Sequence, residues 1–402
     1  MIKRIELTNF FSFREETIEL NAGSNLAIGV NGSGKSNLFK ALRLLKVGIE
    51  GNRDNTALQS LLLGKYGGFD AIFCQSAETT DFDNSIGLTF TFDKHRLSNY
   101  GFASREDVDY KIVVIRQPGS SNYYISEKIA SGDFVFLDFM NGRGKVTERT
   151  DDMPKWMTYD DYNPAELTLS QISEFDKERY LPLVVLKRAL RQMNIYNYFD
   201  TTEDSKIRRS VAATSSIKQL LPDGRNLGQI LNQIKIQNKR SYRQIIAKLA
   251  DVNEYFEGIS FQILGAGTLE LYLDEIALDK AVHISQVSDG TLRYLCIMAI
   301  LYNPDRGSFI CIDEPEVGLH PDMIYNVAQA IKDAAETSTL IVSTHSPELL
   351  NLFSLENILV FEKNEQNATE VRSYTDEQFK NWYDSYLPGK MWVAGDLGGK
   401  RW

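Results

Sequence analysis

The chain contains, close to its start, the stretch Gly29-Val30-Asn31-Gly32-Ser33-Gly34-Lys35-Ser36. This stretch fits the pattern G-x-x-x-x-G-K-[ST], in which glycines let backbone N–H groups turn inward around a phosphate group without a side-chain clash. Residues 25–28 before it are typical of a short buried strand, and apolar residues recur at helical spacing over 36–47 after it. A strand, a glycine-rich loop and a helix in this order predict a phosphate-binding loop at the positive end of the helix.

The predicted loop assigns a role to its polar groups. Lys35 is expected to place its charge between the β- and γ-phosphates, and Ser36 is expected to offer its hydroxyl to Mg²⁺. A chance glycine turn is the alternative, and the flanking strand and helix make it the weaker one. The loop by itself indicates a nucleoside triphosphatase. We expect the nucleotide to be held by Asn31, Gly32, Ser33, Gly34, Lys35, Ser36 and Asn37.

Two carboxylates end an apolar strand in the C-terminal part of the chain. Residues 309–312 are apolar and are followed by Asp313 and Glu314. Acidic residues at the carboxyl end of a buried strand lie where open α/β sheets bind ligands. We expect Asp313 to hold Mg²⁺, directly or through water, and Glu314 to act as general base toward the attacking water. Taken alone, a strand that runs into a solvated turn would explain this segment as well.

Two further segments flank these carboxylates. Ser288 and Gly290 open an apolar helix, where backbone N–H groups and the helix dipole can bind an anion, although an ordinary capped helix is the default explanation. His345 follows another apolar strand and lies 31 positions after Glu314, which leaves room for one helix and one strand between them. A lone histidine after a strand is more often structural than functional.

Composition is that of an ordinary globular protein with an acidic balance. Of the 402 residues, 43% are hydrophobic and 24% are charged, and the formal net charge is −10. No run of 18 or more uncharged apolar residues occurs, so we expect no membrane span. The cysteines lack zinc-ligand spacing, which favours reduced, packed thiols in a cytoplasmic protein. They are Cys74, Cys296 and Cys311.

The segments between the motifs predict an α/β fold. Strand-like runs within 69–92 and 108–140 predict a hairpin-rich sheet, whereas the polar stretch 141–165 predicts a surface loop. Residues 166–200 and 226–256 are expected to be helical because their apolar residues recur at helical spacing.

Strands are then expected over 258–264 and 268–274, leading into the C-terminal motifs. The predicted organisation has three parts. They are an N-terminal lobe with the phosphate loop (1–145), a compact helical insertion (146–256) and a C-terminal lobe that carries the other motifs and a docked tail (257–402).

Two features remain open. Basic residues in the middle part favour either contact with the phosphates of DNA or RNA or a solvated helix face. They are Lys206, Arg208, Arg209, Arg225, Lys235, Lys239, Arg240, Arg243 and Lys248. The tail places Trp392 and Trp402 among glycines, which predicts a docked tail or a partner contact.

The order of phosphate loop, Ser-x-Gly, Asp-Glu and His resembles that of the ABC-type ATPases. Within them the chain is similar to the cytosolic branch of SMC, RecF and OLD-like proteins. The resemblance rests on Asn9-Phe10-x-Ser12-Phe13, on residues 29–37, and on Asp313-Glu314-Pro315-Glu316-x-Gly318-Leu319-His320-Pro321. It implies an ATPase head, in which an antiparallel lobe joins a mostly parallel sheet flanked by helices.

The resemblance also implies ATP and Mg²⁺ as ligands and a head-to-tail homodimer that sandwiches two ATP molecules. Ser288 and Gly290 of one subunit would contact the γ-phosphate held by the loop of the other. His345 would be the switch histidine that senses this phosphate, and 316–320 would cross the interface. A glutamine normally links Mg²⁺ to the first lobe. Gln75 is the candidate for it, with Gln117 as the alternative.

Several functions agree with this resemblance. The tail is similar to the ends of compact bacterial ATPases that work with a separate effector, a nuclease or a toxin, in phage defence. The alternative is a RecF-like ATPase that clamps DNA during repair. About 40 residues follow 357–362, so we expect no nuclease domain of the kind found in OLD proteins. A transporter subunit fits poorly because the signature reads Ser-Asp-Gly-Thr. Nucleic-acid binding and an oligomer above the dimer stay open.

Overall fold

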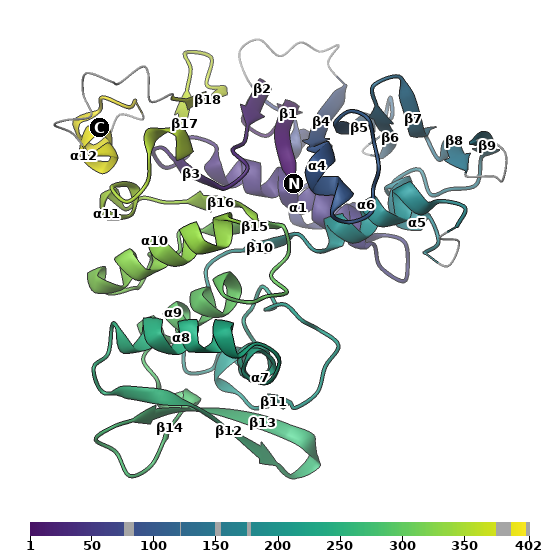
Figure 1. Ribbon diagram of the computed structural model, residues 1–402. Helices are drawn as coiled ribbons and strands as arrows, with labels where there is room; N and C mark the ends of the chain where they lie inside the picture. Colours follow the sequence, from purple (N-terminus) through teal and green to yellow (C-terminus); the bar gives the residue numbers. More distant parts are fainter. Residues whose placement is uncertain (76–83, 121, 149–153, 175–177, 375–386, 399–402) are drawn as a thin grey trace.

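A mixed sheet, a large antiparallel sheet and a small third sheet organise the molecule. The computed structural model describes residues 1–402 except 76–83, 121, 149–153, 175–177, 375–386 and 399–402. In Figure 1 the two larger sheets occupy the upper part, and the small sheet lies at the bottom beneath α7, α8 and α9. Among the described residues, no helix is long and apolar enough to cross a lipid bilayer.

The antiparallel sheet has eight strands in the order β2-β1-β4-β5-β6-β7-β8-β9. The strand formed by Ile2–Phe10 alternates buried and exposed side chains over most of its length, as expected for a strand with one face on a core. The strands are β1 (Ile2–Phe10), β2 (Phe13–Glu19), β4 (Ser85–Phe92), β5 (Val108–Arg116), β6 (Tyr123–Ser131), β7 (Phe134–Met140), β8 (Arg143–Glu148) and β9 (Lys155–Tyr159). The last two fall within 141–165, so the predicted surface loop is wrong there.

The mixed sheet has six strands in the order β10-β15-β16-β3-β17-β18, and only β18 runs antiparallel to its neighbour. Its strands are β3 (Ser24–Ile28), β10 (Asn194–Tyr196), β15 (Phe309–Asp313), β16 (Thr339–Ser343), β17 (Ile358–Lys363) and β18 (Thr369–Ser373). Strands β3 and β16 are buried at every position, which is typical of parallel strands covered on both faces.

Neighbouring residues of the parallel strands face two different hydrophobic cores. Cys311 and Ile341 belong to the core shared with the antiparallel sheet and with α1, whereas Ile312 and Val342 belong to the core shared with α9 and α10. Burying one such side chain stabilises the fold by about 1.5–3 kcal/mol. The mixed sheet is therefore a central layer held from both sides.

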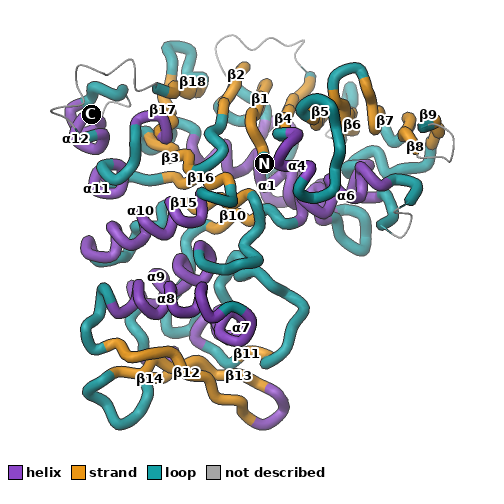
Figure 2. The backbone as a smooth tube through the Cα atoms, viewed as in Figure 1, coloured by secondary structure: helices purple, strands orange, loops and turns teal. Residues whose placement is uncertain are grey.

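The helices are distributed over both cores. Figure 2 shows α10, then α9 and α8, stacked between the mixed sheet and the small sheet. The helices are α1 (Lys35–Glu50), α2 (Ala57–Gln59), α3 (Phe69–Ile72), α4 (Lys94–Ser98), α5 (Thr168–Gln171), α6 (Leu181–Arg191), α7 (Leu227–Gln237), α8 (Lys239–Ala250), α9 (Asp289–Leu301), α10 (Pro321–Ala335), α11 (Pro347–Leu350) and α12 (Pro388–Ala394).

The third sheet lies beside α7 and α8 and comprises β11 (Val211–Ala212), β12 (Phe256–Leu264), β13 (Thr268–Glu275) and β14 (Val282–His283). The hairpin β12–β13 confirms the strands predicted over 258–264 and 268–274. The elements of 146–256 are divided between the parts of the molecule. Helix α6 packs on α1, β10 joins the mixed sheet, and α7 and α8 pack near the small sheet.

Candidate active site

Three parallel strands bring the sequence motifs together at one edge of the mixed sheet. The phosphate loop follows β3, the carboxylates end β15, and His345 follows β16, which lies between these two strands. Parallel strands present their carboxyl ends at the same edge, where such sheets bind ligands. One cavity of about 130 Å³ is lined by Asn31, Gly32, Ser33, Gly34, Lys35, Ser36, Asn37, Asp313, Glu314 and His345.

The phosphate loop needs glycine at two positions for steric reasons. A Cβ on Gly29 would lie 2.3 Å from the carbonyl oxygen of Phe361, and a Cβ on Gly34 would lie 2.4 Å from Thr369 Oγ1. Both residues also have positive φ angles, 149° and 116°. The loop is therefore pressed against β17 and β18, and no side chain fits between them.

Thr369, at the start of β18, supports the loop through its hydroxyl. Thr369 Oγ1 donates to the carbonyl oxygen of Ser33 (2.8 Å) and lies 2.7 Å from Ser12 Oγ, which also accepts from Asn37 Nδ2 (2.8 Å). Ser12 belongs to the turn between β1 and β2, so both large sheets contribute to one network around the loop. Sequence reasoning missed Thr369, whose only signal is a threonine at the start of a short strand.

The ammonium group of Lys35 is buried within the loop. Its Nζ donates to the carbonyl oxygens of Gly29 (2.6 Å) and Val30 (3.3 Å). Burial lowers the pKa of Lys35, while the nearby carboxylates of Glu314 and Asp313 favour the charged form. Bound phosphates would favour the charged form further, because opposite charges stabilise each other.

Ser343 positions the two carboxylates at the end of β15. Ser343 Oγ donates to Asp313 Oδ1, and the N–H of Glu314 donates to the carbonyl oxygen and Oγ of Ser343, both at 3.1 Å. The backbone of Glu314 is left-handed, with a φ of 47°. These hydrogen bonds stabilise the unfavourable backbone conformation of Glu314. As a result, the side chains of Asp313 and Glu314 leave the end of β15 in different directions. Sequence reasoning did not assign a role to Ser343.

His345 is held beside Glu314. Its Nε2 lies 3.4 Å from Glu314 Oε1, and its backbone N–H donates to Glu316 Oε1 (2.8 Å). The same Glu316 oxygen accepts from Thr344 Oγ1 (2.6 Å). Burial raises the pKa of Glu316, and these hydrogen bonds act in the opposite direction. Glu316, which sequence reasoning placed in an interface loop, thus links the end of β15 to the end of β16.

The residues present fit a magnesium ion. Ser36 is exposed and lines the cavity with its hydroxyl-bearing side chain, and Asp313 supplies a carboxylate to the same cavity. Mg²⁺ in nucleotide sites binds one or two protein oxygens and takes its other ligands from phosphates and water. Ser36 and Asp313 are therefore the residues that would hold it.

Gln75 and Gln117 do not line this cavity. Gln75 is exposed and follows Cys74, whose N–H donates to the carbonyl oxygen of Asn9, and Gln117 is at the end of β5. The predicted magnesium ligand Gln75 is thus outside the group that the structure brings together.

Ser288 and Gly290 also lie outside the cavity, at the start of α9. Ser288 caps this helix, with its Oγ accepting from the N–H of Thr291 (3.2 Å), and its side chain is exposed. Gly290 lies against the loop after β15, since a Cβ on it would be 3.0 Å from the carbonyl oxygen of Gly318. The N-terminal end of α9 therefore lies against the loop after β15, outside the cavity that holds the phosphate loop.

Arg208 holds the segment before α9 in place. Its guanidinium donates to the carbonyl oxygens of Ile284, Ser285 and Val287 (2.7–3.1 Å) and to Asp289 Oδ1 (2.6 Å). Arg208 is only 7% exposed, so this member of the predicted basic group supports the fold instead of offering a free charge.

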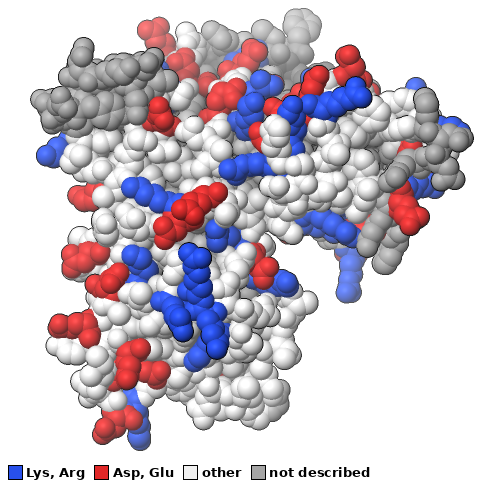
Figure 3. Space-filling view, in the orientation of Figure 1, with Lys and Arg blue, Asp and Glu red and all other residues white. Residues whose placement is uncertain are grey.

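Two other members of that group are also engaged. Lys235 donates to the carbonyl oxygen of Ile259 (3.0 Å), and Lys248 donates to Asn326 Oδ1 (3.0 Å). Exposed basic side chains remain on α8, where Figure 3 shows Lys and Arg gathered on the lower part of the molecule. They are Lys239, Arg240 and Arg243.

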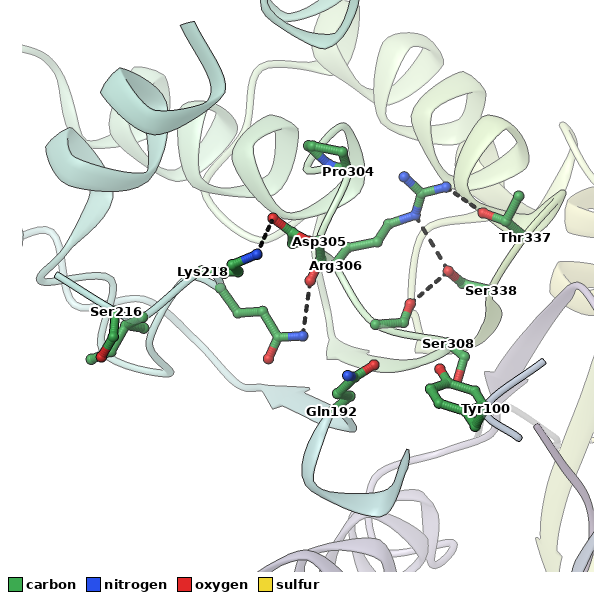
Figure 4. A pocket seen from close by; sticks show the side chains of 13 residues that line it. Tyr100, Gln192, Ser216, Lys218, Pro304, Asp305, Arg306, Ser308, Thr337 and Ser338 are labelled. Atoms are coloured by element: carbon green, nitrogen blue, oxygen red, sulfur yellow. Dashed lines mark hydrogen bonds and ion pairs between the residues drawn. The ribbon is translucent and has the colours of Figure 1, made fainter. Parts of the chain in front are cut away.

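A larger cavity, about 610 Å³, lies at the opposite edge of the mixed sheet, near the starts of β10, β15 and β16 (Figure 4). Its two cations are engaged. Arg306 donates to Thr337 Oγ1 (2.6 Å) and Ser338 Oγ (3.3 Å), and Lys218 pairs with Asp305 (3.8 Å). The described residues that line it include neither a glycine-rich loop nor paired carboxylates. The smaller cavity has both of these features and is therefore the candidate active site.

Two family models match the chain. One, described as "AAA domain", matches residues 4–259, and another, described as "AAA domain, putative AbiEii toxin, Type IV TA system", matches residues 175–351. The Old nuclease of Escherichia phage P2 is 27% identical over 184 residues, which are 42% of this chain and 31% of that protein. The chain thus matches about a third of the length of this relative.

Solved SMC heads share the fold over nearly the whole chain. An SMC head bound to the C-winged helix domain of ScpA has a TM-score of 0.58 at 17% identity, covering 94% of this chain and 99% of that one. An SMC head with an extended coiled coil, bound to the C-terminal domain of ScpA derived from Pyrococcus furiosus, has a TM-score of 0.56 at 14% identity, covering 95% and 98%. From the family match, the shared fold and the converging motifs, we conclude that the chain belongs to the AAA-domain family, as an ABC-type ATPase of the branch that includes SMC heads and OLD-like proteins.

Proposed function

We propose that this protein binds ATP with Mg²⁺ and hydrolyses the γ-phosphate in a site completed by a second copy of the chain. The observation that carries the proposal is the single cavity in which Lys35, the two carboxylates and His345 converge. Its volume of about 130 Å³ suits the phosphate groups, whereas pockets that enclose a whole drug-sized ligand measure roughly 300–1,000 Å³. The rest of the nucleotide would lie outside, against other surface.

The residues of the cavity divide the chemistry between them. The loop N–H groups and Lys35 would hold the phosphates, and Ser36 and Asp313 would hold Mg²⁺, which neutralises charge that develops on the phosphate oxygens. Glu314 would accept the proton of the attacking water. His345, 3.4 Å from Glu314, would hold the base in place and contact the γ-phosphate. Ser343 would fix the directions of both carboxylates.

The second copy would contribute the start of α9. Ser288 is exposed and Gly290 partly so, and both lie outside the cavity of their own chain. A helix N-terminus with free N–H groups stabilises a negative charge. In a head-to-tail dimer this end would meet the γ-phosphate bound by the partner. ATP would then favour the closed dimer, and hydrolysis would release it.

Glu314→Gln tests this proposal. The amide removes the base but keeps the shape, so we expect hydrolysis to fall at least about 100-fold while ATP still binds. The variant should form a dimer with ATP and Mg²⁺ and remain a monomer without them, as measured by light scattering. Glu365→Gln, an exposed control between β17 and β18, should behave as the wild type. A Glu314→Gln protein that stays monomeric with ATP, or that hydrolyses it at the normal rate, contradicts the proposal.

In the cell, we propose that the protein acts as the sensor or regulatory ATPase of an anti-phage defence system with a separate effector. The partial match to a phage Old nuclease and the toxin–antitoxin description of one family model support this context. The nuclease activity of Old is not transferred, because the match spans 31% of that protein.

The cellular test is phage plating on cells that carry the gene with its neighbours. We expect the wild-type genes to lower plating and Glu314→Gln to abolish the effect. Equal plating with and without the genes over a broad phage panel argues against a defence role. The alternative, an ATPase that clamps DNA, is favoured by the exposed basic residues of α8, namely Lys239, Arg240 and Arg243.

A further inference from the structure

The C-terminal helix α12 is closely docked on α11, the short helix that follows His345. The N–H of Gly389 donates to Asn351 Oδ1 (2.8 Å), and a Cβ on Gly389 would lie 2.0 Å from the carbonyl oxygen of Pro347. Figure 1 shows α12, in yellow, beside α11. Glycine is therefore required at this contact because the backbones of the two helices approach directly.

The residues after α12 are docked as well. Leu397 is fully buried, and its carbonyl oxygen accepts from Tyr374 Oη (2.8 Å). At Gly398 a Cβ would lie 2.4 Å from Glu362 Oε1 on β17. The segment 388–398 thus follows the same edge of the molecule from α11 to β17.

This docking places Trp392 against the active-site histidine. Trp392 is 1% exposed, its ring centroid lies 6.3 Å from that of His345, and the two ring planes are inclined by 43°. This distance is within the range of direct aromatic packing. His345 also reaches Glu314, with Nε2 3.4 Å from Oε1. The imidazole therefore lies near both the indole of the tail and the proposed general base.

We propose that Trp392 is a positioning residue for ATP hydrolysis, which acts by limiting the side-chain rotation of His345. This inference rests on the proposed ATPase site. A side chain that must hold one orientation needs packing that excludes its other rotamers. The indole supplies such packing, while Glu314 contacts Nε2 of the same ring. Helix α12 is then a part of the active site that lies about 360 residues after the phosphate loop.

A purely structural role for Trp392 makes a different prediction. A large buried side chain also stabilises the core of which Met391, Leu349 and Leu350 are part. In that case any loss of packing in α12 would lower stability, and kcat of the remaining folded protein would stay constant. The measurement must therefore separate turnover from folding.

The test compares four variants of the full chain in steady-state ATP hydrolysis. Trp392→Ala removes the indole, and Gly389→Ala displaces α12 from Pro347 without changing Trp392. Both should lower kcat about tenfold and change KM for ATP by less than about twofold, because positioning of the catalytic group is lost while phosphate binding is kept. Met391→Ala, equally buried and turned about 100° around the helix, should keep kcat within about twofold. Trp392→Phe should restore most of the activity.

A double-mutant cycle with His345→Gln identifies the route of the effect. If Trp392 acts through His345, then adding Trp392→Ala to His345→Gln should cause no further loss of kcat. Independent losses that multiply, or an unchanged kcat in folded Trp392→Ala protein, overturn the inference. Failure of the proposed function would look different, since the wild type would then show no hydrolysis that depends on Glu314. Circular dichroism and thermal melts confirm that each variant is folded.

Discussion

At Glu314 the backbone adopts a left-handed conformation although the residue carries a Cβ. Such a conformation costs about 1–2 kcal/mol for a residue other than glycine. The cost is offset by two hydrogen bonds from the Glu314 N–H to Ser343, whose hydroxyl also binds Asp313. One serine thus controls the geometry of both acidic side chains.

Ser343→Ala should for this reason affect turnover more than folding. We expect kcat to fall about tenfold, and the free energy of unfolding to fall by about 1–2 kcal/mol, the usual cost of one buried hydrogen bond. Ser338→Ala is the matched control, because Ser338 precedes β16, is buried and donates to the carbonyl oxygen of Gly307 (2.8 Å). The control should lose similar stability and keep kcat. Equal kcat values in the two variants would show that Ser343 does not position the carboxylates.

Glu16 makes stability depend on pH. Burial raises the pKa of Glu16 to about 7, the neighbouring Glu370 adds to the effect, and a hydrogen bond from the N–H of Val371 opposes it. Since the pKa in the folded state lies above the ordinary value of 4.5, the folded protein binds the proton more tightly. The contribution to stability is therefore fully present below about pH 4.5 and is lost as the pH rises to about 7.

Glu16→Gln should remove this dependence. Relative to the wild type, the variant should gain about 1 kcal/mol of unfolding free energy between pH 5 and pH 8, a value reduced for the partial exposure of the side chain. Urea unfolding at the two pH values measures the difference. The same difference from the wild type at both values would contradict the assignment.

At the level of elements, the sequence predicts what has a strong local pattern. The loop 29–36 lies between a strand and a helix, and positive φ angles and close contacts require glycine at Gly29 and Gly34. The sequence pattern therefore identifies this loop directly. Strands β15 and β16 are continuous apolar runs, typical of a parallel sheet. The convergence of their ends follows once the sheet is known to be parallel.

Other elements lack such a pattern. Strand β9, at the edge of its sheet, is exposed at nearly every position, so neither of its faces is marked by an alternation of buried residues. Strand β10 has three residues, too few for a period. The roles of Ser343, Thr369 and Arg208 depend on contacts between residues far apart in the chain, which no local pattern contains.

Arg208 shows how such a distant contact supports an element. Its buried guanidinium joins the 3₁₀ turn before α9 to Asp289 in the first turn of that helix. Arg208→Ala should lower the free energy of unfolding by about 2–4 kcal/mol, because several carbonyl groups lose a charged donor. ATP-dependent dimerisation should weaken as well, since the start of α9 loses its support.

Arg209→Ala is the control for this variant. Arg209 is the next residue and is exposed, so the change should stay within about 0.5 kcal/mol. Unfolding in urea and light scattering with ATP are the two measurements. A folded Arg208→Ala protein that dimerises normally would show that the contacts of Arg208 are not needed for dimerisation.

On the scale of the whole molecule, one local basic group contrasts with an acidic total charge. The chain carries a net charge of −10, yet the exposed side chains of α8 form a local basic group in the lower part. A local group of cations binds phosphate backbones despite an acidic total, and the binding weakens as salt rises. Binding of DNA or RNA by this group would distinguish an ATPase that clamps DNA from one that acts only on a protein effector.

Replacing Lys239, Arg240 and Arg243 together by Gln should weaken binding of DNA or RNA. The slope of log affinity against log salt concentration should become shallower by up to about three. Fluorescence anisotropy over a salt series measures both quantities. Replacing Lys206 and Arg209, which are exposed outside α8, serves as the control. If the wild type does not bind at low salt, or if both variants bind equally, the group on α8 is only a solvated helix face.

Helix α9 has a further mechanical consequence. Every residue from Tyr294 to Leu301 is buried, whereas Ser288 at its start is exposed. Over 294–301 the helix is enclosed around its whole circumference and has no free side toward which to bend. In the proposed dimer, a push at the start of α9 would shift the helix together with the helices packed on it, so that contact with a single phosphate would displace an entire layer.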